Sequence, residues 1–138
     1  MKSKIALAVA AAALLVAPAA ALAAPMSSPH VPNAQSVNRQ ITLAGSPAYP
    51  SAGGGSQYQT QPGQSEFQAE VDHVRSLASK HLLVKVNGAT VGTMNVSRRG
   101  QADLTLNSEL GQRVPTITVG SRVTVTTGSG TLVTSGSY

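Results

Sequence analysis

Apolar and polar residues alternate one by one through the second half of the chain, and this period of two limits the fold more than any other feature. In EFQAEVDH, residues 66–73, the positions of Phe67, Ala69, Val71 and His73 alternate with acidic and amide side chains. Alternate residues of a β-strand point to opposite faces, so this stretch has one apolar face and one wet, acidic face. We therefore predict that residues 66–73 form the first strand of a sheet.

The strongest turn signal in the chain is Asn87-Gly88, which separates alternating runs at 82–86 and 91–96. Both positions of a two-residue hairpin turn take positive φ, which asparagine and glycine adopt at low cost. The two runs are therefore predicted to form a β-hairpin. The alternation changes phase between Val91 and Met94, and a β-bulge at Gly92 would absorb the change.

Shorter alternating runs follow to the end of the chain. Their apolar residues are Ala102, Leu104 and Leu106, then Ile117 and Val119, then Val123 and Val125, then Leu132 and Val133. The segment Arg98–Gln101 joins the hairpin to the first of them, and Gly100 can take the positive φ of a tight connection. Six or seven short strands in all predict an all-β fold, either a small antiparallel β-sandwich or a partly open barrel.

One stretch, residues 72–82, has apolar residues at a helical spacing, and we expect a crossover loop with one helical turn there. The predicted domain, residues 66–138, has 73 residues. In so small a domain the free energy gained by burying apolar surface barely exceeds the entropic cost of ordering the chain. Phe67 is its one aromatic core candidate and should contribute strongly to stability.

The preceding segment, residues 24–65, differs in composition. It contains six prolines, the run Gly53–Gly55 and many serine and glutamine residues. Such a segment buries too little apolar surface to offset the entropy of ordering, so we predict a flexible tail. Within it Val37, Ile41 and Leu43 alternate with polar residues. Solvated coil is the favoured interpretation, and a short strand added to a sheet edge, of this chain or of a partner, is the alternative.

The N-terminus has the three parts of a secretory signal peptide. Lys2 and Lys4 precede an apolar run of about a dozen residues, which ends near the small-residue triplet 21–23. The run is shorter than the roughly 20 residues that span a bilayer, so a membrane anchor is the weaker alternative. We predict cleavage after Ala23 and a secreted or periplasmic protein that is not integral to a membrane.

The absence of cysteine excludes a lipoprotein and disulfide bonds. After removal of Lys2 and Lys4, eight basic residues face five acidic ones, a net charge of +3. The basic residues are interleaved with acidic ones and aromatic residues are rare, so we expect no nucleic-acid partner.

Residues 66–138 resemble a group of small exported bacterial proteins of unknown function. The stretches that carry the resemblance are VNGATVG, GQADLTL, GQRVPTITVG, RVTV and GTLVTSGSY. These are glycine turns and strand residues. The resemblance therefore implies a single β-domain rich in glycine turns, and it implies no catalytic residue.

No motif for catalysis or for a cofactor occurs in the chain. The Gly-x-Ser-x-Gly pattern of a nucleophilic serine is absent, and the acidic residues of 66–72 share an exposed strand face rather than a cleft. We expect a protein that is not an enzyme and needs no cofactor. The alternative function is periplasmic metal binding by His73 and His81, with Glu70, Asp72, His30 or Met26 as further ligands.

With catalysis, cofactor binding and nucleic-acid binding disfavoured, binding of a partner through the protein surface is the remaining class of function. The candidate binding residues are the loop arginines Arg98, Arg99, Arg113 and Arg122, which suit an anionic glycan or an acidic surface of an envelope or extracellular protein. Residues 66–73 and 131–136 are expected to be edge strands, through which a partner or a second copy could add a strand. We predict an interaction or structural module of the cell envelope.

Overall fold

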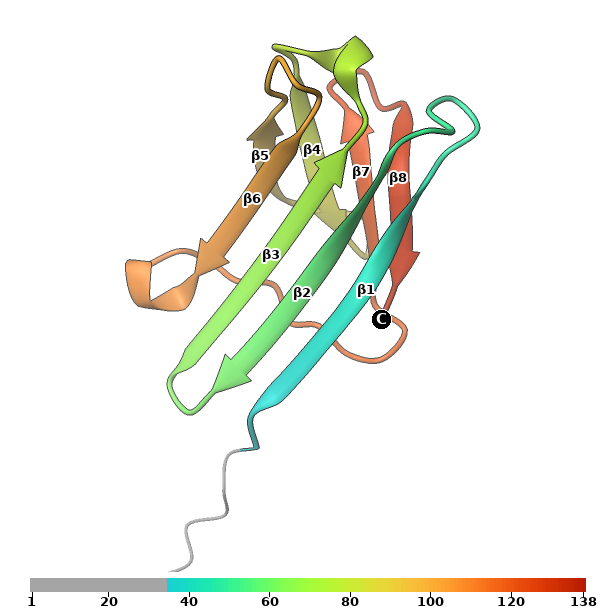
Figure 1. Cartoon of the computed structure of the whole chain (residues 1–138). Coiled ribbons are helices and arrows are strands. Elements are labelled where there is room, and N and C mark those ends of the chain that lie inside the picture. Colours follow the sequence, from blue (N-terminus) through green and yellow to red (C-terminus); the bar gives the residue numbers. More distant parts are fainter. Residues whose placement is uncertain (1–34) are drawn as a thin grey trace, which may run out of the picture. The chain divides into compact units, whose positions relative to one another are not determined.

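The computed structural model describes residues 35–138, and these form one antiparallel sheet of eight strands (Figure 1). The strands are β1 (Val37–Gly45), β2 (Gly53–Gln61), β3 (Gln64–Asp72), β4 (His81–Val86), β5 (Ala89–Asn95), β6 (Ala102–Asn107), β7 (Arg122–Thr127) and β8 (Leu132–Ser137). Two 3-10 turns, η2 (Arg75–Leu77) and η3 (Ser108–Leu110), complete the elements. The all-β prediction is confirmed, with more strands than the six or seven expected. The predicted signal peptide, residues 1–23, lies outside the described residues.

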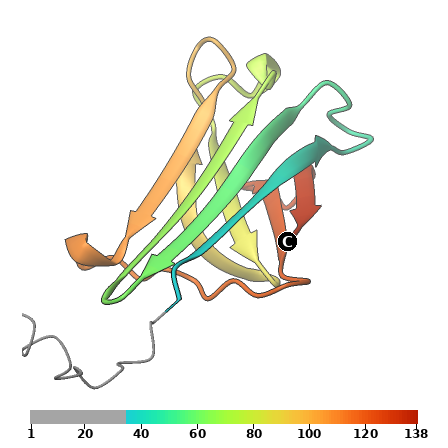
Figure 2. The ribbon, with the colours of Figure 1, turned by 60° about the horizontal axis from the view of Figure 1, so that its bottom comes forward.

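The sheet curls into a nearly closed barrel. The strand order is β5-β4-β7-β8-β1-β2-β3-β6, so β5 and β6 are its two ends. Figure 2 shows β4 and β7 lying across the interior from β2 and β3. The two end strands meet closely, because a Cβ atom added at Gly92 of β5 would lie 2.5 Å from Leu104 Cδ2 of β6. The missing side chain at Gly92 thus lets Leu104 cover the seam.

The prediction of a flexible tail over residues 24–65 is wrong for residues 37–61, and residues 24–34 lie outside the described part of the chain. The described part of this segment contains β1 and β2, and β2 pairs with β1 on one side and along all nine of its residues with β3 on the other. The run Gly53–Gly55 belongs to β2 rather than to a linker. Gly54 has φ +156° and a Cβ atom there would lie 1.9 Å from the Glu70 carbonyl oxygen, so close strand contact requires this glycine.

The predicted edge strands are internal as well. Residues 66–72 fall in β3, which pairs with β2 and β6, and residues 132–136 fall in β8, which pairs with β7 and β1. The favoured prediction of coil at Val37–Leu43 is wrong, because this segment belongs to β1, which lies in the interior of the sheet order. Both errors have one cause. The hairpin of β1 and β2 was not recognised, and it supplies the missing neighbours.

The local turn predictions are confirmed. Asn87 and Gly88 have φ of 49° and 86° between β4 and β5, and Gly100 has φ of 83° before β6. The register of β4 with β5 shifts between Val84 and Lys85 and leaves Val91, next to Gly92, unpaired. The crossover from β3 to β4 contains the single turn η2.

The predicted strand around Ile117 and Val119 does not form. Residues 112–121 contain no strand, and Ile117 is buried whereas Val119 is 75% exposed. β7 already pairs with β4 and β8, so the sheet offers this segment no free neighbour beside β7. Pro115 also lacks the N–H group that a sheet ladder needs.

The barrel interior is filled mainly by apolar side chains, with Ser56 and Thr134 buried among them. Phe67 is fully buried, and its cross-strand neighbours are Tyr58 on β2 and Leu106 on β6. The other side chains with less than 2% exposure are Leu43, Leu82, Met94, Val71, Val74, Val84, Val123, Val125, Val133 and Thr134. These come from both halves of the sheet, so one core holds all eight strands together.

Tyr138 links the C-terminus to this core. Its hydroxyl group lies 2.6 Å from Ser56 Oγ of β2, and its N–H donates to the carbonyl of Ser121. Burial raises the pKa of the Tyr138 phenol above its ordinary value of 10.0, and the hydrogen bond with Ser56 opposes this rise.

The raised pKa predicts a loss of stability in alkali. The unfolded chain releases the Tyr138 proton near pH 10, while the folded chain retains it to higher pH, so the free energy of unfolding should fall as pH rises past about 10. The fall should be shallower in Tyr138→Phe. Urea unfolding of both proteins from about pH 8 to about pH 11 measures it. Equal slopes would show that this phenol ionises freely in the folded protein.

Candidate functional site

The connections between strands place the predicted arginines at opposite ends of the barrel. The loops 46–52, 73–80, 96–101 and 128–131 form one end, which we call the loop end (Figure 1). Arg98 and Arg99 lie there, whereas Arg113 and Arg122 belong to the connection and strand start at the other end, beside the C-terminus. All four side chains are exposed. The structure therefore divides the predicted site into two separate pairs.

The loop end has an open hollow that collects charged side chains from several connections. It is lined by Ser51, Asp72, His73, Arg75, Arg99 and Gln101. Arg99 was predicted as a binding residue and His73 as an alternative metal ligand, but Arg75 was not predicted. Arg98 does not line this hollow.

The backbone of Gly100 holds the two arginines of this hollow near each other. The Val74 N–H donates to the Gly100 carbonyl at 3.1 Å, and a Cβ atom at Gly100 would lie 2.5 Å from Arg75 N. Only a glycine permits this approach of the 96–101 loop to η2. The contact brings Arg99, which precedes Gly100, beside Arg75.

His73 directly follows β3 and has a left-handed conformation, with φ of 59°, so the prediction that it lies on the apolar face of the strand at 66–73 is wrong. This conformation is uncommon for residues other than glycine, although histidine adopts it more readily than most. The His73 Nδ1 atom lies 2.6 Å from Asp72 Oδ1, and the imidazole is 74% exposed. The contact with Asp72 orients the ring.

His81 lies elsewhere and pairs differently. Its Nδ1 atom is hydrogen-bonded with Asn95 Oδ1 across the β4–β5 ladder, and it lines a hollow with Tyr49 and Lys80 rather than the one that contains His73. Within residues 35–138 no group of three or more histidine, cysteine, aspartate or glutamate side chains is placed to hold a metal ion. The structure thus does not join His73 and His81 in one site, and the further candidates His30 and Met26 lie outside the described residues.

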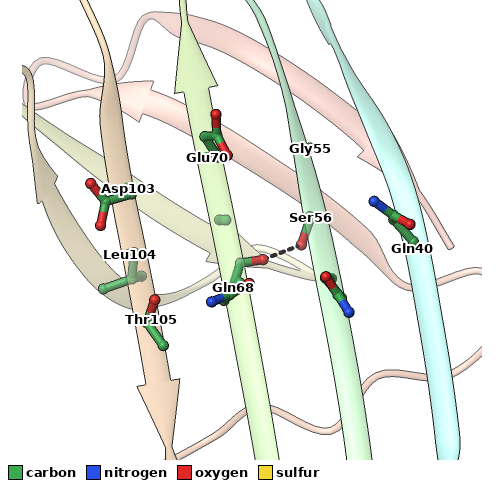
Figure 3. Close-up of a pocket in the computed structure, with 10 residues that line it drawn as sticks. Gln40, Gly55, Ser56, Gln68, Glu70, Asp103, Leu104 and Thr105 are labelled. Atoms are coloured by element: carbon green, nitrogen blue, oxygen red, sulfur yellow. Dashed lines mark hydrogen bonds between the residues drawn. The ribbon is translucent and has the colours of Figure 1, made fainter.

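A hollow that the sequence did not predict lies on the outer face of β1, β2, β3 and β6. Its volume is about 200 Å³. Gln40, Gln57, Gln68 and Thr105 form one row across the four strands, and Glu70 lies directly opposite Asp103 in the row beside it (Figure 3). In the sequence of any one strand, these residues are only the polar members of an alternating pattern. The rows depend on the register of strands that are far apart in the sequence.

Comparison of the chain with protein-family models, with curated proteins and with solved structures finds no match. Across residues 35–138, no helix has the length and apolar character needed to cross a membrane.

Proposed function

We propose that the protein is an exported, non-catalytic binding module of the cell envelope whose loop end holds an anionic glycan. The observation that carries this proposal is the placement of Arg75 and Arg99, from different loops, around one hollow. Guanidinium groups bind carboxylate and sulfate oxygens through paired hydrogen bonds. Two of them at one hollow suit a polymer that carries such groups.

The charges around the hollow are available to a ligand. In the described part of the chain the single ion pair joins His73 to Asp72, and neither arginine has a carboxylate oxygen within 4.0 Å. Asp72 is the one acidic residue that lines the hollow, and its Oδ1 atom is already engaged by His73. The net character of the hollow is therefore cationic.

The opposite end of the barrel supports this function less well. Arg113 lines a hollow there, but the other lining residues are uncharged and include Val91, Val114 and Pro115. Arg122 does not line that hollow. A single guanidinium beside apolar side chains offers an anionic polymer fewer contacts than the loop end does.

Strand addition by a protein partner or by a second copy is also less favoured. The end strands β5 and β6 approach each other closely at Gly92 and Leu104, so a strand added to either edge would have to enter between them. Metal binding by His73 and His81 stays a prediction, and no contact of the two residues supports it over glycan binding.

Exchange of the two arginines should weaken glycan binding. We expect Arg75→Gln, Arg99→Gln to bind polygalacturonate at least about tenfold more weakly than the unaltered chain, since each lost charged hydrogen bond costs roughly 1.5–3 kcal/mol when fully formed. Arg113→Gln, Arg122→Gln removes the same net charge at the opposite end and is the matched control. Isothermal titration calorimetry at low and high salt measures both.

The proposal also predicts that binding weakens with salt, because exposed charges are screened. Uncharged dextran serves as the ligand control. Equal losses in the two double variants would mean that net charge alone attracts the polymer, and the assignment to the loop end would then be wrong.

A further inference from the structure

The backbone of the fold does not require a glycine at position 55 of β2. The pairing of Gly55 with Thr42 of β1 and Glu70 of β3 continues without a bulge, and its φ is not in the left-handed region. A Cβ atom at this position would meet only the Ile41 carbonyl oxygen, at an ordinary 3.5 Å. The neighbouring Gly54, by contrast, is required by close strand contact. A glycine inside a regular strand weakens it, and such a residue often marks the close approach of a ligand.

The missing side chain at Gly55 opens the hollow on the outer face of the sheet. The floor includes Ser56 and Ala69, whose side chains are buried beneath it. Figure 3 shows Gln40, Gln68 and Glu70 around this position, with the side chains of β6 along the far wall. Any larger side chain at residue 55 would project into this space, since residue 55 lies on the same face as Glu70.

The side chains around the hollow fit a ligand rich in hydroxyl groups. The amides of Gln40, Gln57 and Gln68 both donate and accept hydrogen bonds, whereas Glu70 and Asp103 only accept when ionised. A hydroxyl group can serve both kinds of partner. No cationic side chain lines the hollow, so its two carboxylates would repel an anionic ligand.

We propose that this hollow is a second binding site, which takes one uncharged sugar unit of a glycan. A volume of about 200 Å³ is of the size of a single sugar ring. Hydroxyl groups of the ring would donate to Glu70 and Asp103 and accept from the amides. The site is separate from the loop-end hollow and has the opposite charge. The two proposed binding sites can therefore be tested independently of each other.

Nuclear magnetic resonance titration with cellohexaose, maltohexaose and chitohexaose tests the proposal. At least one of these uncharged glycans should shift the backbone amide signals of residues 55–57, 68–70 and 103–105. Gly55→Thr, which fills the hollow while retaining a strand-forming residue, should weaken binding by about tenfold or more. Gly128→Thr is the matched control, because a side chain there meets nothing within 4 Å, and it should bind as the unaltered chain does.

A second variant tests the site without the risk that Gly55→Thr disturbs folding. Glu70→Gln, Asp103→Asn keeps the side-chain size and removes both charges, and it should also weaken binding of the same glycan. Arg75→Gln, Arg99→Gln should leave this binding unchanged. The proposal is wrong if none of the three glycans shifts these signals, or if a folded Gly55→Thr variant binds with unaltered affinity.

Discussion

A chain that starts at Glu66 is expected not to fold, although residues 66–138 have the clearest strand pattern of the sequence. Removal of β1 and β2 exposes the whole edge of β3, which pairs with β2 through all nine residues. It also removes Tyr58 from the side of Phe67 and Ser56 from the hydroxyl group of Tyr138. An uncovered edge above an open core favours aggregation over a cooperative fold.

Circular dichroism melting and size-exclusion chromatography with light scattering of residues 35–138 and 66–138 test this expectation. The longer chain should melt cooperatively, whereas the shorter one should show no cooperative transition or should aggregate. A cooperative melt of a monomeric 66–138 chain would contradict it and would show that the β1–β2 hairpin is an accessory to an independent domain.

Truncation of Phe67 should cost about 3–5 kcal/mol of unfolding free energy, the usual cost of Phe→Ala in a core. The side chain has 0% exposure and lies between Tyr58 and Leu106 in a cross-strand row. Phe67 is the only phenylalanine of a chain that has no tryptophan.

Urea unfolding of Phe67→Ala measures this cost, and Gln68→Ala is the control on the same strand. Gln68 points to the outer face, so its truncation should change the unfolding free energy by less than about 0.5 kcal/mol. A loss of less than about 1 kcal/mol for Phe67→Ala would mean that the site collapses around the smaller side chain.

The elements that the sequence predicted correctly are those whose cause is local. Asn87-Gly88 makes a hairpin because both residues tolerate positive φ, and Gly100 makes a tight connection for the same reason. Alternation in residues 66–72 and 102–106 predicted β3 and β6, because a period of two has one interpretation when apolar residues mark one face.

The β1–β2 hairpin was missed because its stability depends on its neighbours. Gly53, Gly54 and Gly55 contribute no apolar surface of their own, and a rule based on composition assigns them to a linker. In the structure their backbone groups pair with β1 and β3, and Gly54 fits where a side chain would clash with Glu70. The strand is favoured by the partners on either side of it.

The candidate sites also have some features with a local cause and others that depend on distant contacts. Alternation and turn signals predicted correctly that the polar residues of β3 share a face, that Phe67 belongs to the core and that Arg98, Arg99 and Arg113 lie in connections, whereas Arg122 is the first residue of β7. Contacts between distant segments bring Arg75 beside Arg99, place Arg113 and Arg122 at the other end, and put Gly55 at a hollow between a row of amides and a pair of carboxylates. The physical reason is that turn geometry and alternation act over a few residues, whereas a site depends on strand register and loop contacts between residues far apart in the chain.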